Sequence, residues 1–415
     1  MNIANLFEQA YERMIDRFGE CPDVRILNRF YHEKMYLQER EHLHILALAA
    51  CVRARAGEKG EHVAVRGTAQ ASLIGYLLGA TDINPLPAHE YCPVCKKTVF
   101  TDRGSPYDRN FRKCSCGANA YIDGYDLPFE TNLREAMLER IQIGVSYSFF
   151  DEAKNIIRDE MWDHAIITLH GERPIGPTWF CFADREQNDD AEYSLKEDSP
   201  LFGRLPRVTL VPMKMLDSYK ALETATGVKM KDAGRNGGME EMLTLFQGDF
   251  DDISNVDSGF MRELAEKTHP LSYEDVLKLI GFAHGARVWV GNAEWLYDEH
   301  RATLADIPAF REDVYDMIGQ KLRQKGLCES GLAYEVAKKA RSGYYARMGV
   351  DHATMTALLS LGFDIDFIFF LERVEYMFPK SHAVSYMRDA VILTWYKLHY
   401  PQEFARVFQE KTKND

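Results

Sequence analysis

Apolar residues recur every three or four positions over the first 58 residues of the chain, which is the period of an amphipathic helix. A second helical pattern covers residues 35–55. From residue 218 to the end the pattern is again helical almost throughout. The breaks in this long helical part fall near Gly227–Gly238, His269-Pro270, Gly326, Gly349 and Pro379.

Strand patterns lie between these helical parts. His62–Val65 alternates like a short strand, and Ala165–His170 and Arg207–Leu216 are further apolar runs. Pro212 argues against a central position with full pairing for the last run, because proline cannot donate to a ladder. Residues 149–164 are expected to be helical, and the acidic residues 184–198 to form a surface loop. The order predicts an α+β half, to about residue 230, followed by an all-helical half.

A predicted strand, a glycine turn and a predicted helix follow one another within residues 61–87. Arg66-Gly67 interrupts the strand, and Thr68 is placed to cap a helix over Ala69–Leu78. Such a junction presents backbone N–H groups and the positive end of a helix dipole, which suit a phosphate, and Arg66 adds a planar set of donors. An ordinary strand–turn–helix connection explains the same residues, so both interpretations stay open.

Four of the eight cysteines have the spacing of a metal site. They form the pairs Cys92-Pro-Val-Cys95 and Cys114-Ser-Cys116. Two close thiolate pairs on two turns provide a closed tetrahedral set, which predicts a structural Zn²⁺ ribbon over residues 91–123. A reduced, metal-free loop is the alternative. The remaining cysteines are scattered, which indicates a reducing compartment rather than a disulfide framework: Cys21, Cys51, Cys181 and Cys328.

Composition narrows the class of protein further. The chain has 415 residues, of which 46% are hydrophobic and 27% charged, as in soluble globular proteins. No apolar run approaches the ~18 residues of a membrane span, and the acid-containing N-terminal pattern is expected to be neither a signal nor a transit peptide. A cytoplasmic protein without membrane contact is therefore predicted. The net charge of −13 opposes nucleic-acid binding by the whole surface but is compatible with a local basic cleft.

Three stretches resemble PolC-type bacterial DNA polymerase III α subunits, which are C-family polymerases. RGTAQASLIGYLLGATDINPLP, followed by CPVC, is similar to the start of the family's palm. IGFAHGARVWVGNA at Ile280–Ala293 and YMFPKSHAVSYM at Tyr376–Met387 match in the same order. The resemblance covers nearly the whole chain but corresponds only to the palm and fingers. It implies a polymerase β-like nucleotidyltransferase palm with a zinc ribbon over residues 1–230 and a helical fingers domain over 231–415, with the thumb deleted near 150–164.

The resemblance also places the family's metal-binding carboxylates. Three such acids hold the two divalent ions of the polymerase reaction. Gly144 and Ser146 occupy the first two positions here and Lys214 the third, so all three ligands are expected to be missing and Mg²⁺ binding is in question. Asp217, three residues after Lys214 on the predicted strand, would point to the opposite face. Nearby acids leave a rearranged site open: Asp123, Asp126, Asp151 and Glu152.

The fingers motifs contain further candidate ligands. Lys380 and His382 follow Pro379 near a predicted helix start, where they suit a phosphate or a nucleotide, although a packing motif with a solvated lysine is the alternative. The other motif carries His284, Arg287, Trp289 and Asn292. Arginine beside an aromatic residue suits base stacking, while Trp289 in a helical core is equally consistent. Six basic residues lie on two predicted helices: Lys321, Arg323, Lys325, Lys338, Lys339 and Arg341. They are expected either to face a template strand or to form one solvated helix face.

Three functions follow as hypotheses. The first is a degenerate PolC-like core, a pseudoenzyme of DNA replication that binds DNA or nucleotide. Its candidate residues are Arg66, Gly67, Thr68, His284, Arg287, Lys380 and His382. The second is an interaction or decoy protein that docks on replication or other nucleic-acid-processing proteins, which the acidic balance favours. The third is a DNA-directed DNA polymerase or nucleotidyltransferase with relocated carboxylates.

Overall fold

The computed structural model describes residues 3–40, 43–101, 113–133, 140–160, 164–170, 178–184, 207–327 and 331–412. They form two compact units, one of Met1–Arg235 with Tyr396–Asp415 and one of Asn236–Trp395. All strands of the described residues lie in the first unit, and the second is helical. The predicted mixed α+β class is confirmed.

The first unit is built on a five-stranded sheet with the order β1-β5-β8-β7-β6. β5 and β8 are parallel, and the other neighbours are antiparallel. β8 is therefore central but not fully paired, because β7 pairs only with its residues 207–210, and this agrees with the expectation from Pro212. Proline is tolerated because it is the last residue of the strand, where the ladder ends. The strands are β1 (Val63–Arg66), β5 (Arg140–Val145), β6 (His164–His170), β7 (Thr178–Asp184) and β8 (Arg207–Pro212).

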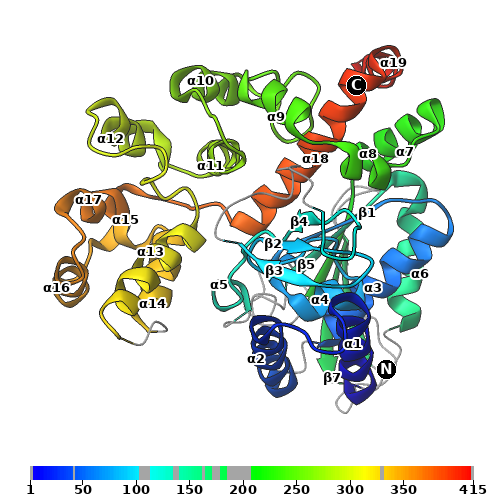
Figure 1. Cartoon of the computed structure of the whole chain (residues 1–415), viewed down its shortest axis with the longest axis horizontal. Coiled ribbons are helices and arrows are strands. Elements are labelled where there is room, and N and C mark those ends of the chain that lie inside the picture. The colour runs from blue at the N-terminus through cyan, green and yellow to red at the C-terminus, as the bar shows by residue number, and fades with distance from the viewer. Residues whose placement is uncertain are drawn as a thin grey trace. The chain divides into compact units, whose positions relative to one another are not determined.

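Helices pack on this sheet and bury one apolar core. α1, α2 and α3 contact the short helix α4, and α6 contacts both α3 and β8 (Figure 1). Met14, Phe30 and Ile143 are among the fully buried members of the core. The helices of this unit are α1 (Ile3–Phe18), α2 (Val24–Arg40), α3 (Leu43–Glu58), α4 (Leu73–Leu78), α5 (Glu130–Leu133), α6 (Phe150–Glu160), α7 (Lys214–Thr226), α8 (Met230–Asn236) and α19 (Pro401–Thr412).

A small antiparallel sheet carries the cysteine module. Its strands are β2 (His89–Tyr91), β3 (Thr98–Phe100) and β4 (Tyr121–Asp123), in the order β3-β2-β4. The Tyr91 hydroxyl donates to the Arg17 carbonyl oxygen at 2.9 Å, and the Arg17 guanidinium pairs with Asp123 at 2.5 Å. These contacts fix the small sheet to α1.

The second unit consists of helices with short connections. Ser258, Ser272, Asp351 and Asp364 accept backbone N–H groups at the starts of four of them. A π-turn over Trp289–Ala293 precedes α12. The helices are α9 (Met239–Phe246), α10 (Gly259–Thr268), α11 (Tyr273–His284), α12 (Glu294–Asp298), α13 (Arg311–Gln324), α14 (Leu332–Arg341), α15 (Tyr344–Met348), α16 (His352–Ser360), α17 (Ile365–Arg373) and α18 (Lys380–His399), whose last residues belong to the first unit.

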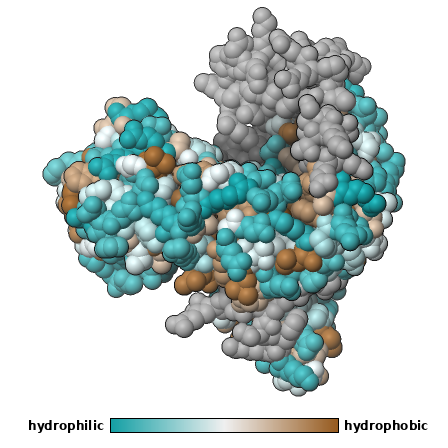
Figure 2. All heavy atoms as spheres, turned by 90° about the horizontal axis from the view of Figure 1, so that it is seen from above, coloured by the Kyte–Doolittle hydropathy of each residue, from teal (hydrophilic) through white to brown (hydrophobic). Residues whose placement is uncertain are grey.

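On the face drawn in Figure 2, hydrophilic residues predominate and hydrophobic residues form small groups between them. Within the described ranges, no helix has both the length and the apolar character needed to cross a lipid bilayer.

Candidate nucleotide site and metal centre

The glycine turn after β1 differs from its prediction. Gly67 adopts a φ of 100°, which favours glycine, and a 3₁₀ turn over Thr68–Ala71 follows. The α-helix begins only at Leu73, so Thr68 does not cap it, and the Thr68 side chain lies outside the described part. Ser72 is the cap, because its hydroxyl accepts the Gly75 N–H at 2.9 Å. The chain thus makes one more turn before α4 than the apolar pattern indicated.

A buried carboxylate fills the start of α4. Glu33 of α2 is fully buried and accepts the backbone N–H groups of Leu73 at 2.9 Å and Ile74 at 3.0 Å, and the Ser72 hydroxyl at 2.9 Å. Arg29, one helical turn earlier, pairs with it at 2.5 Å. The amide groups that a phosphate would need at this helix therefore already bind an internal anion.

Arg29 also ties this turn to the rest of the unit. Its guanidinium donates to the carbonyl oxygens of Ala71 at 2.6 Å and Leu127 at 2.9 Å. Arg66, the predicted phosphate ligand, is only 9% exposed at the end of β1. The turn is consequently packed into the fold, as the structural interpretation of these residues expects.

Gly144 faces a methionine where the resemblance places the first metal-binding acid. Gly144 lies on β5, beside Val211 of β8 and Ala64 of β1. A methyl group added to Gly144 would lie 2.6 Å from Met213 Cε, which is much closer than van der Waals contact. The Met213 thioether thus occupies the space that a side chain at position 144 would enter.

Ser146 belongs to a polar network at the end of β5. Its buried hydroxyl donates to Glu61 Oε2 at 2.7 Å. The Lys220 ammonium and the Ser148 hydroxyl donate to the other oxygen, Oε1. Burial acts to raise the pKa of Glu61, but the hydrogen bonds from Lys220 and Ser146 outweigh it and hold the pKa below its ordinary value. The position of the second family acid therefore carries a donor that serves an internal carboxylate.

Lys214 begins α7 instead of continuing a strand. Asp217 follows three residues later, so the two lie on neighbouring positions of one helix face rather than on opposite faces of a sheet. Asp217 Oδ2 accepts the Tyr147 N–H at 3.3 Å. This corrects the strand prediction for the segment.

The other acids considered as replacements are engaged elsewhere or exposed. Asp123 binds Arg17 and accepts the Asn84 amide at 2.8 Å, and Asp151 pairs with Lys154. Asp126 is exposed. Among the described residues, no three acids bring their carboxylate oxygens within 4.8 Å of one another.

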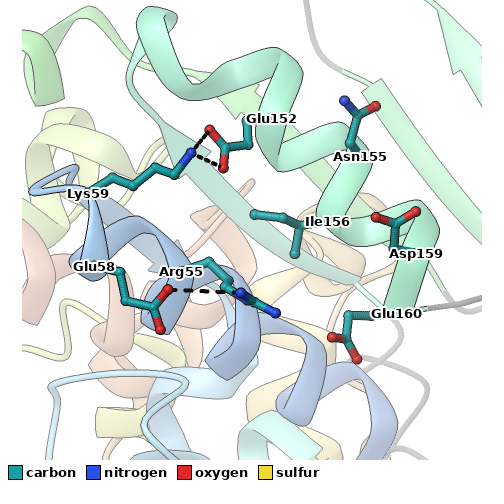
Figure 3. A pocket seen from close by; sticks show the side chains of 8 residues that line it. All are labelled: Arg55, Glu58, Lys59, Glu152, Asn155, Ile156, Asp159 and Glu160. Carbon is teal, nitrogen blue, oxygen red and sulfur yellow. Dashed lines mark hydrogen bonds and ion pairs between the residues drawn. The ribbon is translucent and has the colours of Figure 1, made fainter.

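Glu152 lines a shallow pocket of about 280 Å³ between α3 and α6 (Figure 3). Lys59 faces Glu152 across the pocket and pairs with it at 2.6 Å, while Arg55 lies 3.9 Å from Glu58. The remaining lining residues are Asn155, Ile156, Asp159 and Glu160. Glu152 is thus neutralised by a lysine.

The cysteine module gathers its four sulfurs as predicted. The Sγ atoms of Cys92 and Cys116 are 3.5 Å apart, those of Cys95 and Cys114 are 3.4 Å apart, and all four lie within 4.8 Å of one another. The Cys95 N–H lowers the pKa of the Cys92 thiol, and the Cys116 N–H lowers that of Cys114 to about 6. Four thiols in such a cluster fit a closed tetrahedral metal centre.

Two short turns position these cysteines. The Cys92 N–H donates to the Lys97 carbonyl oxygen at 3.0 Å, and the Cys114 N–H donates to that of Ala118 at 2.9 Å. Gly117, at φ 85°, closes the second turn. The Cys-x-Cys spacing is therefore accommodated by a glycine turn directly after the second thiol.

The two matched motifs of the second unit pack on each other. Ala286 and Tyr376 exchange backbone hydrogen bonds at 2.9 and 3.1 Å. The His284 ring lies 4.9 Å from that of Phe378, and the His382 ring lies 5.7 Å from it. The candidate residues His284 and His382 therefore belong to one aromatic cluster.

Other residues of the first motif divide between core and surface. Trp289 is 2% exposed, and Asn292 donates to the carbonyl oxygens of Arg287 and Phe370, both at 3.1 Å. Trp289 is thus part of the helical core. Arg287 is exposed and lies 3.6 Å from Glu375.

The start of α18 is a buried charged site. Glu312 is fully buried, accepts the Lys380 N–H at 3.1 Å and pairs with Arg311 at 2.8 Å. Lys380 is 8% exposed, and the buried Ser381 hydroxyl has no hydrogen-bond partner within the described ranges. The sequence patterns predicted no role for three residues of this site, Arg311, Glu312 and Ser381. The signal available was the charged Arg-Glu-Asp run directly after apolar residues.

The basic run lies on two packed helices, α13 and α14. Lys321 donates to the Gly362 carbonyl oxygen at 3.0 Å and Lys325 to that of Ser360, at the end of α16. Lys339 lies 3.6 Å from Asp351. These lysines have partners within the unit, two of them at carbonyl groups near a helix C-terminus.

Together, these features describe a mixed α+β protein with a four-cysteine cluster that fits a metal ion and a helical second unit. No protein-family model matches the chain. It is similar to the DNA polymerase III PolC-type of Thermotoga petrophila, with 23% identity over 83% of this chain and 30% of the relative. The same protein of Streptococcus agalactiae is 26% identical over 84% of this chain and 28% of its own length, and that of Listeria welshimeri 24% over 83% and 28%.

The predicted resemblance is confirmed: most of this chain is similar to part of the PolC-type DNA polymerase III proteins. It spans less than a third of the length of these curated relatives.

Proposed function

We propose that this chain is a catalytically degenerate PolC-like polymerase core that binds DNA or nucleotide without synthesising DNA. In this proposal the first unit corresponds to a palm with a zinc ribbon, and the second to the fingers. Its setting is DNA replication in the cytoplasm, where reduced cysteines are available to hold Zn²⁺. The similarity to PolC-type polymerases supports the polymerase-related setting.

The packing at the ends of β5 and β8 is the main observation that supports a loss of catalysis. Two-metal catalysis requires carboxylates that converge on an open site. Here the Met213 side chain lies against Gly144, and the Ser146 hydroxyl is already hydrogen-bonded to the Glu61 carboxylate. A Lys220 cation on the same carboxylate would further oppose a divalent ion. The proposal therefore assigns no catalytic residue and no Mg²⁺.

The start of α18 supports retained binding of a phosphate group. This helix has 20 residues, and Lys380 stands at its first position. Two buried cations, Arg311 and Lys380, lie at this helix start, and the buried Ser381 hydroxyl has no hydrogen-bond partner among the described residues. Positive charge and a free hydroxyl at a helix N-terminus suit a phosphate group. His382 lies two residues further along. We therefore favour Lys380, Ser381 and His382 over the glycine turn as the nucleotide ligands.

Binding of a fluorescent deoxynucleoside triphosphate and of a fluorescent primer–template DNA tests this proposal. We expect DNA affinity to fall steeply as salt is raised, because phosphate contacts release counterions. Lys380→Gln should weaken triphosphate binding by about 10- to 100-fold, the worth of a charge-assisted hydrogen bond of ~1.5–3 kcal/mol. Lys267→Gln, which removes an exposed ion pair in the same unit, is the matched control. No binding of either probe at low salt would refute the proposal.

The chain's net charge of −13 favours a second candidate, an interaction protein that keeps the PolC-like form to dock on replication proteins. It predicts no DNA affinity at any salt concentration, together with a stable complex with purified replication proteins in size-exclusion chromatography. The two candidates are thus separated by the same salt series.

A further inference from the structure

Four exposed apolar side chains lie on neighbouring elements of the second unit. They come from the π-turn before α12, from α12 and from α17, elements that lie together (Figure 1). The exposed fractions are 58% for Val290, 39% for Trp295, 44% for Ile365 and 45% for Phe369. We call these four residues the apolar patch. Trp295 lies beside α17, because Arg301 and Arg373 approach its ring and Arg301 pairs with Asp366 of α17.

The pattern of α17 indicates that this surface is covered in the working protein. The helix buries Phe367, Ile368 and Phe370 against its own unit. Ile365 and Phe369, one turn apart, add apolar groups to its outer side. An outer side that carries large apolar groups among charged residues is typical of a protein contact surface. In addition, Val290 is held outward where the π-turn leaves helical geometry, at φ −57° and ψ 120°.

Charges of both signs surround the apolar patch. The Arg301 and Arg373 guanidinium carbons lie 5.2 and 5.8 Å from the Trp295 ring centroid. Arg301 pairs with Asp366 at 2.5 Å. Arg287 and Glu375 are only 3.6 Å apart, yet their side chains remain 58% and 55% exposed.

These charged residues indicate which kind of molecule could bind to the apolar patch. A nucleic acid would meet the carboxylates of Asp366 and Glu375 at the same place as the arginines. A surface that carries ion pairs, such as Arg301 with Asp366 and Arg287 with Glu375, is instead able to exchange these pairs with a second copy of itself. Trp, Phe and Arg are also the residues that dominate protein–protein contacts.

We propose that the apolar patch is the interface of a homodimer, with a second copy of this chain as its occupant. A two-fold axis brings the apolar patch of one copy against the same patch of the other copy. Each contact between two residues then occurs twice in the interface. The four apolar side chains then bury one another. Arg287 of each copy exchanges Glu375 of its own chain for Glu375 of the other. This inference is independent of the proposed DNA or nucleotide binding.

The mass in solution tests the interface. Sedimentation equilibrium of the full chain over a range of concentrations should give twice 47.7 kDa. Phe369→Asp should give the monomer mass at the same concentrations, because a charge replaces an apolar contact. The control is Leu271→Asp, which changes an 83% exposed leucine elsewhere in the unit and should leave the dimer intact. Circular dichroism establishes that each variant is folded.

A charge exchange makes the test specific for reciprocal contact. Arg287→Glu and Glu375→Arg should each raise the dimer dissociation constant by about tenfold or more, because like charges then face each other. Mixing the two variants should restore a dimer of one copy of each, since opposite charges meet again at both positions.

Several results would overturn the inference. These are a wild-type chain that stays at 47.7 kDa throughout, a Phe369→Asp variant that remains dimeric, or two charge variants that do not recombine. A monomeric wild type that binds oligo(dT) and loses this binding in Trp295→Ala would assign the patch to single-stranded DNA instead.

Discussion

Replacing Gly144 by alanine tests whether Met213 fills the space at the end of β5. Glycine in a strand costs roughly 0.5–1 kcal/mol relative to alanine, so this change would ordinarily stabilise the protein. Here the new methyl group would meet Met213 Cε at 2.6 Å. Overpacking of this kind costs typically ~1–3 kcal/mol. We therefore expect Gly144→Ala to destabilise the wild type by about 1–2 kcal/mol.

The Met213→Ala background should reverse the sign of this effect. With the thioether removed, Gly144→Ala should stabilise by about 0.5 kcal/mol, which gives a coupling free energy of roughly 2 kcal/mol between the two positions. Thermal unfolding measures it, because 1 kcal/mol shifts the midpoint by about 2 °C for a unit as large as the first. Gly57→Ala, at an open position of α3, is the control and should stabilise slightly in both backgrounds. A stabilising Gly144→Ala change in the wild type would refute the packing argument.

Three further predictions concern the first unit. Cys92→Ser should release about one Zn²⁺ per chain, measured by metal analysis, and lower the thermal midpoint. Glu33→Ala should cost about 3–5 kcal/mol in urea unfolding, because Arg29 and the start of α4 lose a buried anion, whereas Glu58→Ala at an exposed pair should cost under ~1 kcal/mol. Burial would raise the pKa of Asp123, but the Arg17 charge holds it below its ordinary value. The stability this pair contributes should therefore be constant above about pH 4 and be lost as pH falls further, and Asp123→Asn should flatten that acid dependence in pH-dependent melts.

Local patterns predicted the elements whose signals lie within a few residues. The cysteine spacing was sufficient for the four-sulfur cluster, because two short turns bring each pair together regardless of the rest of the fold. The strand at residues 62–65 and the helix at 149–164 correspond to β1 and α6, shifted at their ends. The C-terminal residues 396–415, in contrast, join the first unit, although the helical pattern gives no sign of it.

Long-range contacts explain most of what the sequence did not reveal. Glu33 lies 40 residues before the helix that it caps, so no local pattern connects them. The only trace is Arg29 one turn earlier on the same helix. Lys214 was assigned to a strand because apolar residues continue past Pro212, whereas the ladder ends there and α7 begins. Whether Lys380 and His382 bind nucleotide stays a prediction.

Primer extension distinguishes a catalytically degenerate core from an active polymerase. The purified chain would be incubated with a labelled primer–template and all four deoxynucleotides, in Mg²⁺ and separately in Mn²⁺. The account predicts no extended product in either metal under salt conditions in which the chain binds the DNA, because no group of three acids converges among the described residues. Extension that is abolished by Glu61→Gln or Asp217→Asn would contradict it and would identify relocated carboxylates at the ends of β5 and β8.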